Sequence, residues 1–526
     1  MPPRRSLLAA ALLIVSFAGL SLWEMTGDSL TTDELWHLPV GYAYWKTGEF
    51  RLSPEHPPLA KLLCAATLLP LRLGLPPTTP PPGTTWHDYP ALFGSAFFRL
   101  NPDVDRILFR SRLPVLALGG LLLLTIFFWS WRLHGHPGAG LLSLALASLE
   151  PTLIAHSHFV TTDIALAAFA LLAFAALWRF CDAGRMRHLA LAVTAMGLAL
   201  ASKFSALVLL PMFFLLLLLR WPGGAGGRRP GLARRGLAAL AALFVMATIV
   251  QACYFFSSDL SLYLRGPAEV QAYKPVNHVA YVRGAFHVGG VFWYALYAWL
   301  IKTPLPTLAI TALGFLLYRR DPHRTRDVRQ FILMPAGLYA LAVCLLASNY
   351  GVRYLIPMTA FLLVLAGAAH RWFVSTPTRR LAAAGLALWL VVSLGRAAPH
   401  FIAYFNELIG GPADAAQVIH DSNVDWGQDL KRLARYQQKN GIPELILFYW
   451  GGAQPDHYGV RFRPLTFENA RADRPPDGTY AISVNHLVDM KRSVVLGGVH
   501  PNLDWLGRFR PSDRVGYSIY IYRFGP

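Results

Sequence analysis

Four ionisable residues stand close together in the sequence, just after its first apolar stretch. Residues 31–63, TTDELWHLPVGYAYWKTGEFRLSPEHPPLAKLL, contain Asp33, Glu34, Glu55 and His56. Carboxylates and imidazoles serve as general acids and bases, and both also ligate metal ions. Charged groups are costly to keep beside hydrocarbon, so they are usually retained there for function. The cluster therefore predicts a functional site at a membrane boundary.

The same residues also have a structural interpretation. Thr31 precedes Glu34 by three residues, the spacing of a capping box that satisfies the free N–H groups of a helix start. Asp33 in that first turn would be stabilised by the helix dipole, by up to about 1 kcal/mol. Glu55 and His56 precede a second short helix, whose prolines suit its first turn. Two such helix starts, meeting at the membrane surface, could bind a lipid headgroup.

A second polar motif, AHSHFVTTD, stands at the expected outer end of another apolar segment. It contains His156, His158 and Asp163. Together with Glu55 and His56, these side chains could ligate a divalent metal ion. Interfacial histidines and a helix cap at Asp163 are the simpler alternatives, and the spacing does not require a metal.

Two cations are candidates for binding a phosphate. Lys203 interrupts an apolar run over residues 187–220, which is too long for one crossing, so we expect a hairpin with Lys203 at its outer tip. Arg353 in NYGVRYLIP is also expected on the outer side. A lipid phosphate would be bound by one or two such groups. Snorkelling to the interface is the alternative role for each.

Membrane helices must position these residues. The chain has 526 residues, of which 54% are hydrophobic and 15% charged, whereas roughly a quarter of the residues in soluble domains are charged. Apolar runs of about 18–25 residues recur over residues 1–397, and each can cross a hydrocarbon core of roughly 30 Å. The sequence predicts an α-helical polytopic membrane domain with about eleven spans, near 7–25, 107–131, 138–156, 162–181, 187–203, 205–220, 236–256, 290–318, 330–348, 352–370 and 380–397.

The basic residues predict the orientation of these spans. The formal net charge is +19, and the basic residues collect in alternate loops, as the positive-inside rule requires of cytoplasmic loops. We expect a multi-pass protein of the cell (inner) membrane, with a cytoplasmic N-terminus and with the site and the C-terminus outside. Nucleic-acid binding is not needed to explain the charge. The clusters are Arg4 and Arg5; Arg185 and Arg187; Arg220, Arg228, Arg229, Arg234 and Arg235; Arg319, Arg320, Arg324, Arg326 and Arg329; and Arg371, Arg379 and Arg380.

The tail changes character and predicts a second domain over residues 398–526. It lacks long apolar runs and has short strand-like ones, ELILFYW, TYAISV and GYSIYIYRF, beside a helical stretch near 426–439. This alternation is typical of a small α/β domain, which we expect in the extracytoplasmic space.

One tail segment, HDSNVDWGQDLKRL, has acids at the spacing of a calcium loop. Asp421, Asn423 and Asp425 match its first positions, but Trp426 and Arg432 stand where a glycine and an acid are needed. An EF-hand is therefore excluded. A helix start capped by Asp425 and a role in handling the acceptor both stay open.

The motifs together resemble those of the GT-C glycosyltransferases that use lipid-linked sugars. The resemblance covers roughly residues 1–400 and rests on TTDELWH, GYAYWKTGEF, EHPPLAKLL, TTD, ASKFSAL and GVRYLIP. Protein O-mannosyltransferases and the bacterial enzyme that adds aminoarabinose to lipid A look most similar. The resemblance implies an inverting transfer of a monosaccharide from polyprenyl phosphate (undecaprenyl or dolichyl phosphate) to a hydroxyl acceptor, a protein, lipid or glycan, on the outer face of the membrane.

The resemblance also implies roles for single residues. Asp33 stands at the position of the catalytic base. Glu55 matches a carboxylate that binds a metal or organises the site of the aminoarabinose enzyme, which has a lysine in place of His56. In the mannosyltransferases that carboxylate comes one residue earlier, where this chain has Pro54. Substrate contacts are expected from Glu34, His56, Lys61, Lys203 and Arg353, and contacts to a divalent metal from Glu55, His156 and Asp163.

A flippase or transporter of a lipid-linked sugar is the alternative function. Transporters place their charged site near the bilayer midplane, often within paired repeats. Here the acids are expected at the outer boundary of the membrane, and the sequence has no recognisable repeated halves. An intramembrane protease would need a motif such as HExxH or GxSxG, which the sequence lacks. The sugar and the acceptor are not identified by the sequence.

Overall fold

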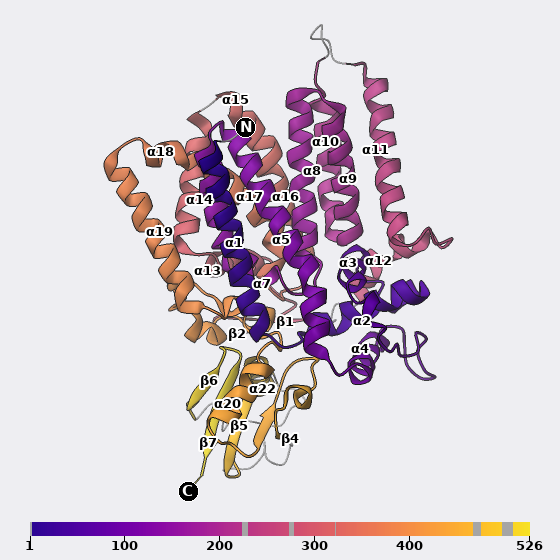
Figure 1. Cartoon of the computed structure of the whole chain (residues 1–526), viewed down its shortest axis with the longest axis vertical. Coiled ribbons are helices and arrows are strands. Elements are labelled where there is room, and N and C mark those ends of the chain that lie inside the picture. The colour runs from indigo at the N-terminus through magenta and orange to yellow at the C-terminus, as the bar shows by residue number, and fades with distance from the viewer. Residues whose placement is uncertain are drawn as a thin grey trace.

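The computed structural model describes residues 3–223, 230–272, 278–320, 322–465, 475–496 and 509–525. Figure 1 shows a bundle of long helices with the C-terminal sheet at one end and the N-terminus near the other. Three short helices, α2 (Thr32–Thr47), α3 (Leu59–Ala66) and α4 (Tyr89–Leu100), lie at the sheet end of the bundle. The segment that holds the predicted site is therefore located where the bundle meets the C-terminal domain.

The apolar composition explains the helical bundle, and prolines and glycines explain where its helices begin and end. Prolines occupy the first turn of several helices, where their missing N–H costs nothing, and Gly135 and Gly184, with φ of 71° and 66°, end α5 and α8. The other helices before the C-terminal domain are α1 (Arg4–Gly27), α5 (Val104–His134), α6 (Pro137–Ser148), α7 (Pro151–His156), α8 (Asp163–Ala183), α9 (Met186–Ser202), α10 (Leu210–Leu219), α11 (Leu232–Cys253), α12 (Ser261–Ala272), α13 (Tyr294–Lys302), α14 (Leu305–Leu317), α15 (Pro322–Asp327), α16 (Met334–Leu346), α17 (Ile356–Ala366), α18 (His370–Val374) and α19 (Pro377–Ala397).

The predicted polytopic helical fold is confirmed. In the described part of the chain, seven helical segments are long and apolar enough to cross a membrane, and α13 with α14, bent by 111°, would make an eighth. The predicted count of about eleven included three segments that form shorter apolar helices, Pro137–Ser148, Met186–Ser202 and Phe204–Leu219. A break at Leu149 and Glu150 shortens the first, and Lys203 separates the other two. Helices α9 and α10, on the two sides of Lys203, both contact α8 and α11.

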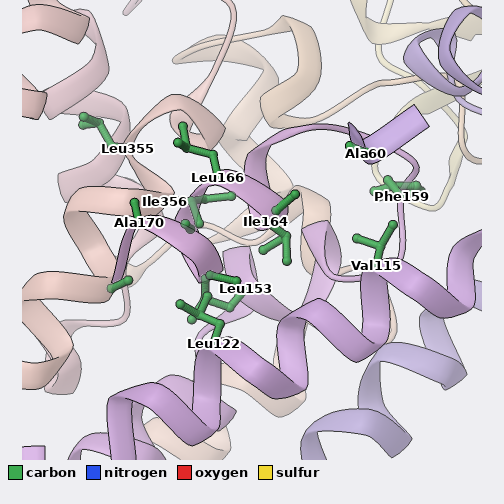
Figure 2. Close-up of a cluster of buried hydrophobic side chains, with 14 of the residues drawn as sticks. Ala60, Val115, Leu122, Leu153, Phe159, Ile164, Leu166, Ala170, Leu355 and Ile356 are labelled. Carbon is green, nitrogen blue, oxygen red and sulfur yellow. The ribbon is translucent and has the colours of Figure 1, made fainter. Parts of the chain in front are cut away.

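The centre of the bundle is formed by α8 and the segment Val352–Val374. In each of them 78% of the most apolar window is buried, against 17% in α1 and α11. Alanines dominate the buried face of α8, and small residues allow helix backbones to approach closely in a membrane. Figure 2 shows the core beside it, where Leu122 of α5, Leu153 of α7 and Ile164 of α8 meet. This rigid core holds the start of α8, and thus Asp163, in place.

The C-terminal domain contains a five-stranded mixed sheet. The strand order is β4-β3-β5-β7-β6, with β3 parallel to β4 and β5, and β7 antiparallel to β5 and β6. The three predicted strand runs and the predicted helix are confirmed as β3, β5, β7 and α20. The elements are β3 (Leu445–Phe448), β4 (Phe462–Pro464), β5 (Gly478–Ser483), β6 (Asp513–Val515), β7 (Ile519–Phe524), α20 (Leu430–Lys439) and α22 (Val484–Leu496); a separate hairpin pairs β1 (Val279–Val282) with β2 (Ala285–Val288).

The segment between α19 and α20 joins the two parts of the molecule. Its Trp426 carbonyl accepts a hydrogen bond from the backbone N–H of Thr32 at 3.2 Å, and the Gln428 carbonyl accepts one from Ser29 at 2.8 Å. Lys302 is buried and donates to the carbonyls of Ile402, Tyr404 and Asn423 at 2.7–3.0 Å. These bonds fix the tail segment against the start of α2 and the end of α13.

Candidate active site

The start of α2 is a buried junction built on Glu34. The predicted capping box with Thr31 is confirmed, and both Thr31 donors lie 3.0 Å from Glu34 Oε2. Arg112 of α5 donates to both carboxylate oxygens, at 2.8 and 2.7 Å, and the Val160 N–H donates to Oε1 at 3.2 Å. Glu34 has no exposed surface. Five donors already enclose the carboxylate, which supports a structural role, and the expected contact of Glu34 with substrate stays a prediction.

Asp33 faces the opposite way and remains about one-fifth exposed at its side chain. Its Oδ2 accepts a hydrogen bond from the Arg353 guanidinium, and its Oδ1 accepts one from Trp426 Nε1 at 3.2 Å. Burial alone would raise the pKa of Asp33, but Arg353 and these hydrogen bonds bring that pKa below its ordinary value. The carboxylate is therefore ionised at neutral pH and can accept a proton.

A second ion pair lies beside the first. Lys203 Nζ is 2.5 Å from Asp163 Oδ1, and Arg353 is 3.8 Å from Asp163 Oδ2. Tyr354 lies under Lys203, with the ammonium 4.7 Å from its ring centroid. The structure thus joins Asp33, Arg353, Asp163 and Lys203 in one group, which we call the charge quartet.

Glu55, His56 and Lys61 form a separate buried cluster at the start of α3. Glu55 accepts a hydrogen bond from Ser53 Oγ and lies 3.8 Å from Lys61, which also donates to the Ser53 carbonyl at 2.8 Å. The His56 ring lies 5.3 Å from that of His37. Burial, followed by the charges of His37 and Lys203, lowers the pKa of His56 well below its ordinary value. A neutral His56 thus lies within the electrostatic influence of Lys203.

The predicted metal ligands do not come together. Among the described residues, no three His, Cys, Asp or Glu side chains are placed to hold a metal ion. Asp163 pairs with Lys203 and Glu55 with Ser53 and Lys61, while the His156 ring packs 5.5 Å from that of Trp426. The donor set therefore does not fit the expected divalent ion.

Trp426 is the site residue that sequence reasoning missed. Its ring is 1% exposed and lies 4.5 Å from the guanidinium carbon of Arg353, while its N–H reaches Asp33. The sequence motif around it suggested a helix start or a role in handling the acceptor, but it assigned no role to Trp426 itself. Asp425 does not cap a helix, because α20 begins at Leu430 and Asp425 accepts a bond from the Gly427 N–H at 3.0 Å.

A small polar cavity lies near the charge quartet. Its volume is about 190 Å³, and it is lined by ten residues from the membrane domain and the C-terminal domain: His278, Val279, Asn349, Tyr350, His420, Asp421, Trp450, Asn485, Asp489 and Arg492. The charges of Arg353 and Asp33 both influence the Asp421 carboxyl, so the cavity is close to the quartet. Aromatic rings beside amides and carboxylates offer stacking surfaces and hydrogen-bond partners for a hydroxyl-rich ligand.

Comparison with known proteins agrees with this arrangement. Residues 95–252 match the family described as dolichyl-phosphate-mannose-protein mannosyltransferase. The crystal structure of apo ArnT from Cupriavidus metallidurans is similar, with a TM-score of 0.51 at 14% identity over 98% of this chain and 97% of that one. The chain therefore has an ArnT-like fold. ArnT bound to undecaprenyl phosphate gives a TM-score of 0.50 with the same identity and coverage. The chain matches no curated protein sequence.

The likeness to ArnT concerns the fold of the chain and includes its C-terminal domain, since nearly the whole of both chains is covered. Together with the family match over residues 95–252, it confirms the predicted resemblance to GT-C enzymes. The roles of the single site residues stay predictions. An oligosaccharyltransferase of Archaeoglobus fulgidus gives a TM-score of 0.44 at 12% identity over 86% of this chain and 64% of its own.

Trp426→Phe tests the contact between the tail and Asp33. Phenylalanine keeps a ring under Arg353 but removes the N–H that donates to Asp33. Hydrogen bonds to charged groups contribute roughly 1.5–3 kcal/mol, so we expect kcat to fall by about tenfold or more. Tyr458→Phe, which removes a hydroxyl 2.9 Å from the Leu30 N–H outside the quartet, is the control. Equal kcat values for Trp426→Phe and the wild type would show that the bond does not serve transfer.

Asp421→Asn tests the charge in the polar cavity through stability. Burial raises the pKa of Asp421 from 3.8 to about 6, so the folded state holds this proton more tightly than the unfolded state. That stabilisation is present below the unfolded pKa and is lost as the pH rises through about 6. Asparagine tolerates the left-handed φ of 63°. We expect the variant to melt above the wild type at pH 7–8, with the difference shrinking towards pH 4; a constant difference would contradict the assignment.

Proposed function

We propose that the protein transfers a monosaccharide from a polyprenyl-phosphate carrier to a hydroxyl group of a protein, lipid or glycan acceptor. The observation that carries this proposal is the charge quartet, which offers one carboxylate for a proton and two cations for a phosphate. The undecaprenyl phosphate bound in the similar structure of ArnT supports a carrier of this class.

In the proposed reaction, the acceptor oxygen bonds to the anomeric carbon as the bond from that carbon to the phosphate oxygen breaks. The hydroxyl proton passes to Asp33, and polyprenyl phosphate leaves with the bonding electrons. Attack from the face opposite the leaving group inverts the anomeric configuration. Lys203 and Arg353 offset the negative charge that develops on the phosphate, because preorganised cations stabilise such charge strongly in a partly buried site.

The pairing of Asp33 with Arg353 fits this sequence of events. A carboxylate hydrogen-bonded to an arginine is a weak base, because the arginine favours its ionised form. A phosphate bound at Arg353 would compete for that guanidinium and weaken its contact with Asp33. Donor binding would then raise the basicity of Asp33 when the acceptor hydroxyl has to lose its proton.

The polar cavity beside the quartet is proposed to receive a sugar ring of the donor or acceptor. At about 190 Å³ it is smaller than the roughly 300–1,000 Å³ of pockets for drug-sized ligands, which suits a single ring. We place this site on the outer face of the membrane, with the N-terminus in the cytoplasm, on the basis of the alternating basic loops.

The test is a transfer assay with purified, lipid-supplied protein. A panel of polyprenyl-phosphate sugars is incubated with membrane extracts, and products are identified by mass spectrometry. A glycosylated acceptor together with free polyprenyl phosphate is the expected result. Movement of a labelled lipid-linked sugar across proteoliposomes without acceptor, and without any transfer product, would favour the flippase instead.

A further inference from the structure

The polar cavity near the charge quartet opens on the side of the C-terminal domain. Asn485, Asp489 and Arg492 line it from one face of α22, where their spacing of four and three residues brings them together. Arg492 pairs with Asp489 at 3.4 Å, and these two side chains are 40% and 29% exposed, so the mouth of the cavity faces solvent there. A hydrophilic ligand can therefore enter from the C-terminal domain, whereas Lys203 lies among the membrane helices, between α9 and α10.

Asp421 is held in the cavity wall in an unusual backbone conformation. Its φ is 63°, in the left-handed region that residues other than glycine rarely adopt. The Asp421 N–H donates to Asn485 Oδ1 at 2.8 Å, and Asp421 Oδ1 accepts a hydrogen bond from the Ser422 N–H. Such strain is concentrated at functional sites, where the surrounding structure maintains it. The conformation of Asp421 thus indicates a function for its side chain.

The segment around Asp421 is fixed to the segment that carries Arg353. The side chain of Asn423 is fully buried, and its Oδ1 accepts a hydrogen bond from the Val352 N–H at 3.0 Å. Arg353 follows Val352 directly in the chain. The charges of Arg353 and Asp33 both act on the Asp421 carboxyl. A ligand bound by Asp421 would therefore lie near the proposed base, Asp33.

The ionised Asp421 carboxylate is kept at a cost to stability. Burial raises its pKa to about 6, so the group is mostly ionised at pH 7.5 although the folded state favours its neutral form. Arg353, the cation that lowers this pKa, is already bound to Asp33. A carboxylate accepts hydrogen bonds through two oxygens, and two neighbouring hydroxyls of one ligand could supply them. A group that lowers stability in this way is retained most often for function.

The remaining lining residues suit a single sugar ring. His420 lines the cavity, and in the described structure its buried Nδ1 atom has no hydrogen-bond partner. Burial and the charge of Arg492 lower the pKa of His420 to about 4, so its ring is neutral and can accept a hydrogen bond from a ligand hydroxyl. Trp450 adds a flat aromatic surface. An extended peptide would need a groove rather than a hollow of about 190 Å³.

We propose that the acceptor is a carbohydrate whose terminal ring occupies this cavity, with two neighbouring hydroxyls bound to the Asp421 carboxylate. Another hydroxyl of the same acceptor would then lie near Asp33 and receive the transferred sugar, so this assignment rests on the proposed function. The carrier phosphate is held at Lys203 and Arg353, and the donor sugar lies outside the cavity. Asp421 is thus a residue that determines which acceptor is used.

The test is the binding of methyl glycosides to the detergent-purified full chain, titrated by saturation-transfer difference NMR at pH 7.5. The panel contains the methyl glycosides of glucose, galactose, mannose and N-acetylglucosamine. We expect at least one of them to bind the wild type, with a dissociation constant that rises at least tenfold in Asp421→Asn. In Asp456→Asn, whose exposed carboxylate does not line the cavity, it should change less than twofold. The four corresponding undecaprenyl-phosphate sugars, measured by native mass spectrometry, should bind the wild type and Asp421→Asn alike.

Three outcomes would overturn the assignment. Binding of no glycoside to the wild type would show that the cavity is not a carbohydrate site. Equal glycoside affinities in the wild type and Asp421→Asn, with a melting temperature at or above the wild-type value, would show that Asp421 does not contact the ring. Weaker binding of an undecaprenyl-phosphate sugar, but not of undecaprenyl phosphate, to Asp421→Asn would assign the cavity to the donor sugar.

Failure of the proposed function gives a different result. The absence of any transfer product, together with glycoside binding that depends on Asp421, would overturn the sugar transfer and leave the cavity as a carbohydrate-binding site.

Discussion

Asp33→Asn is expected to reduce sugar transfer by about 10²–10⁴-fold, the range that a positioned general base contributes. Asparagine keeps the shape of the side chain and can still accept a hydrogen bond from Trp426, but it cannot take the hydroxyl proton. Arg353 would retain Asp163 as a neighbour at 3.8 Å, so the variant should fold and insert normally. The measurements are kcat for transfer and the affinity for undecaprenyl phosphate, which should change little or rise because Arg353 is released.

The control for Asp33→Asn is Asp105→Asn. Asp105 also pairs with a cation, Lys431 at 2.7 Å, but its side chain is 65% exposed and lies outside the quartet. The Asp105→Asn variant should transfer sugar at the wild-type rate. Retained turnover in Asp33→Asn, with normal expression and melting temperature, would remove Asp33 as the base. A loss of carrier affinity together with turnover would instead give Asp33 a binding role.

The paired charges of the quartet explain how such a site can persist beside a membrane without substrate. An isolated buried charge is expensive, whereas two carboxylates facing two cations neutralise one another. Asp163 and Lys203 at 2.5 Å form one pair, and Asp33 with Arg353 forms the other. A carrier phosphate entering this group adds a third anion, so it must displace a carboxylate from a cation. We infer that the displaced carboxylate is Asp33, because Asp163 is the more deeply buried of the two.

Features with a local cause could be predicted from the sequence. The capping box needs only Thr31 and Glu34, three residues apart, and it is present. The interruption by Lys203 of an apolar run too long for one span predicted the hairpin, and the chain is broken there between α9 and α10. Both inferences depend on spacing within one helix or on the thickness of the membrane, which act independently of the rest of the fold.

Features that depend on distant contacts could not be predicted. Glu34 is bound by Arg112, 78 residues away, and Asp33 by Trp426, 393 residues away. No periodicity links such pairs, since tertiary packing alone brings them together. For the same reason the sequence predicts a shared metal site for Glu55, His156 and Asp163, although Lys61 pairs with Glu55 and Lys203 pairs with Asp163.

Glu34→Gln is expected to lower the free energy of unfolding by about 3–5 kcal/mol, which is the cost of removing one charged partner of a buried ion pair while the other stays buried. Arg112 would stay buried, with exposed surface of only 1%, and would lose its charged partner. The new amide NH2 would also face donors in place of one oxygen, either the two that now donate to Oε1 or the three that now donate to Oε2. Because Arg112 also binds the carbonyls of Met25, Asp28 and Ser29 at 2.9–3.2 Å, the junction between α1 and α2 should loosen.

The measurement is the thermal midpoint in one detergent at one scan rate, since unfolding of a chain this large is often irreversible. Glu49→Gln is the matched control, because Glu49 also pairs with an arginine, Arg51, whose side chain is 60% exposed. Such surface pairs contribute about 0–1 kcal/mol, so the control should melt like the wild type. Any Glu34→Gln protein that remains folded should bind undecaprenyl phosphate normally. A variant with a wild-type midpoint but no carrier binding would contradict the structural role and return Glu34 to the substrate contacts predicted from the sequence.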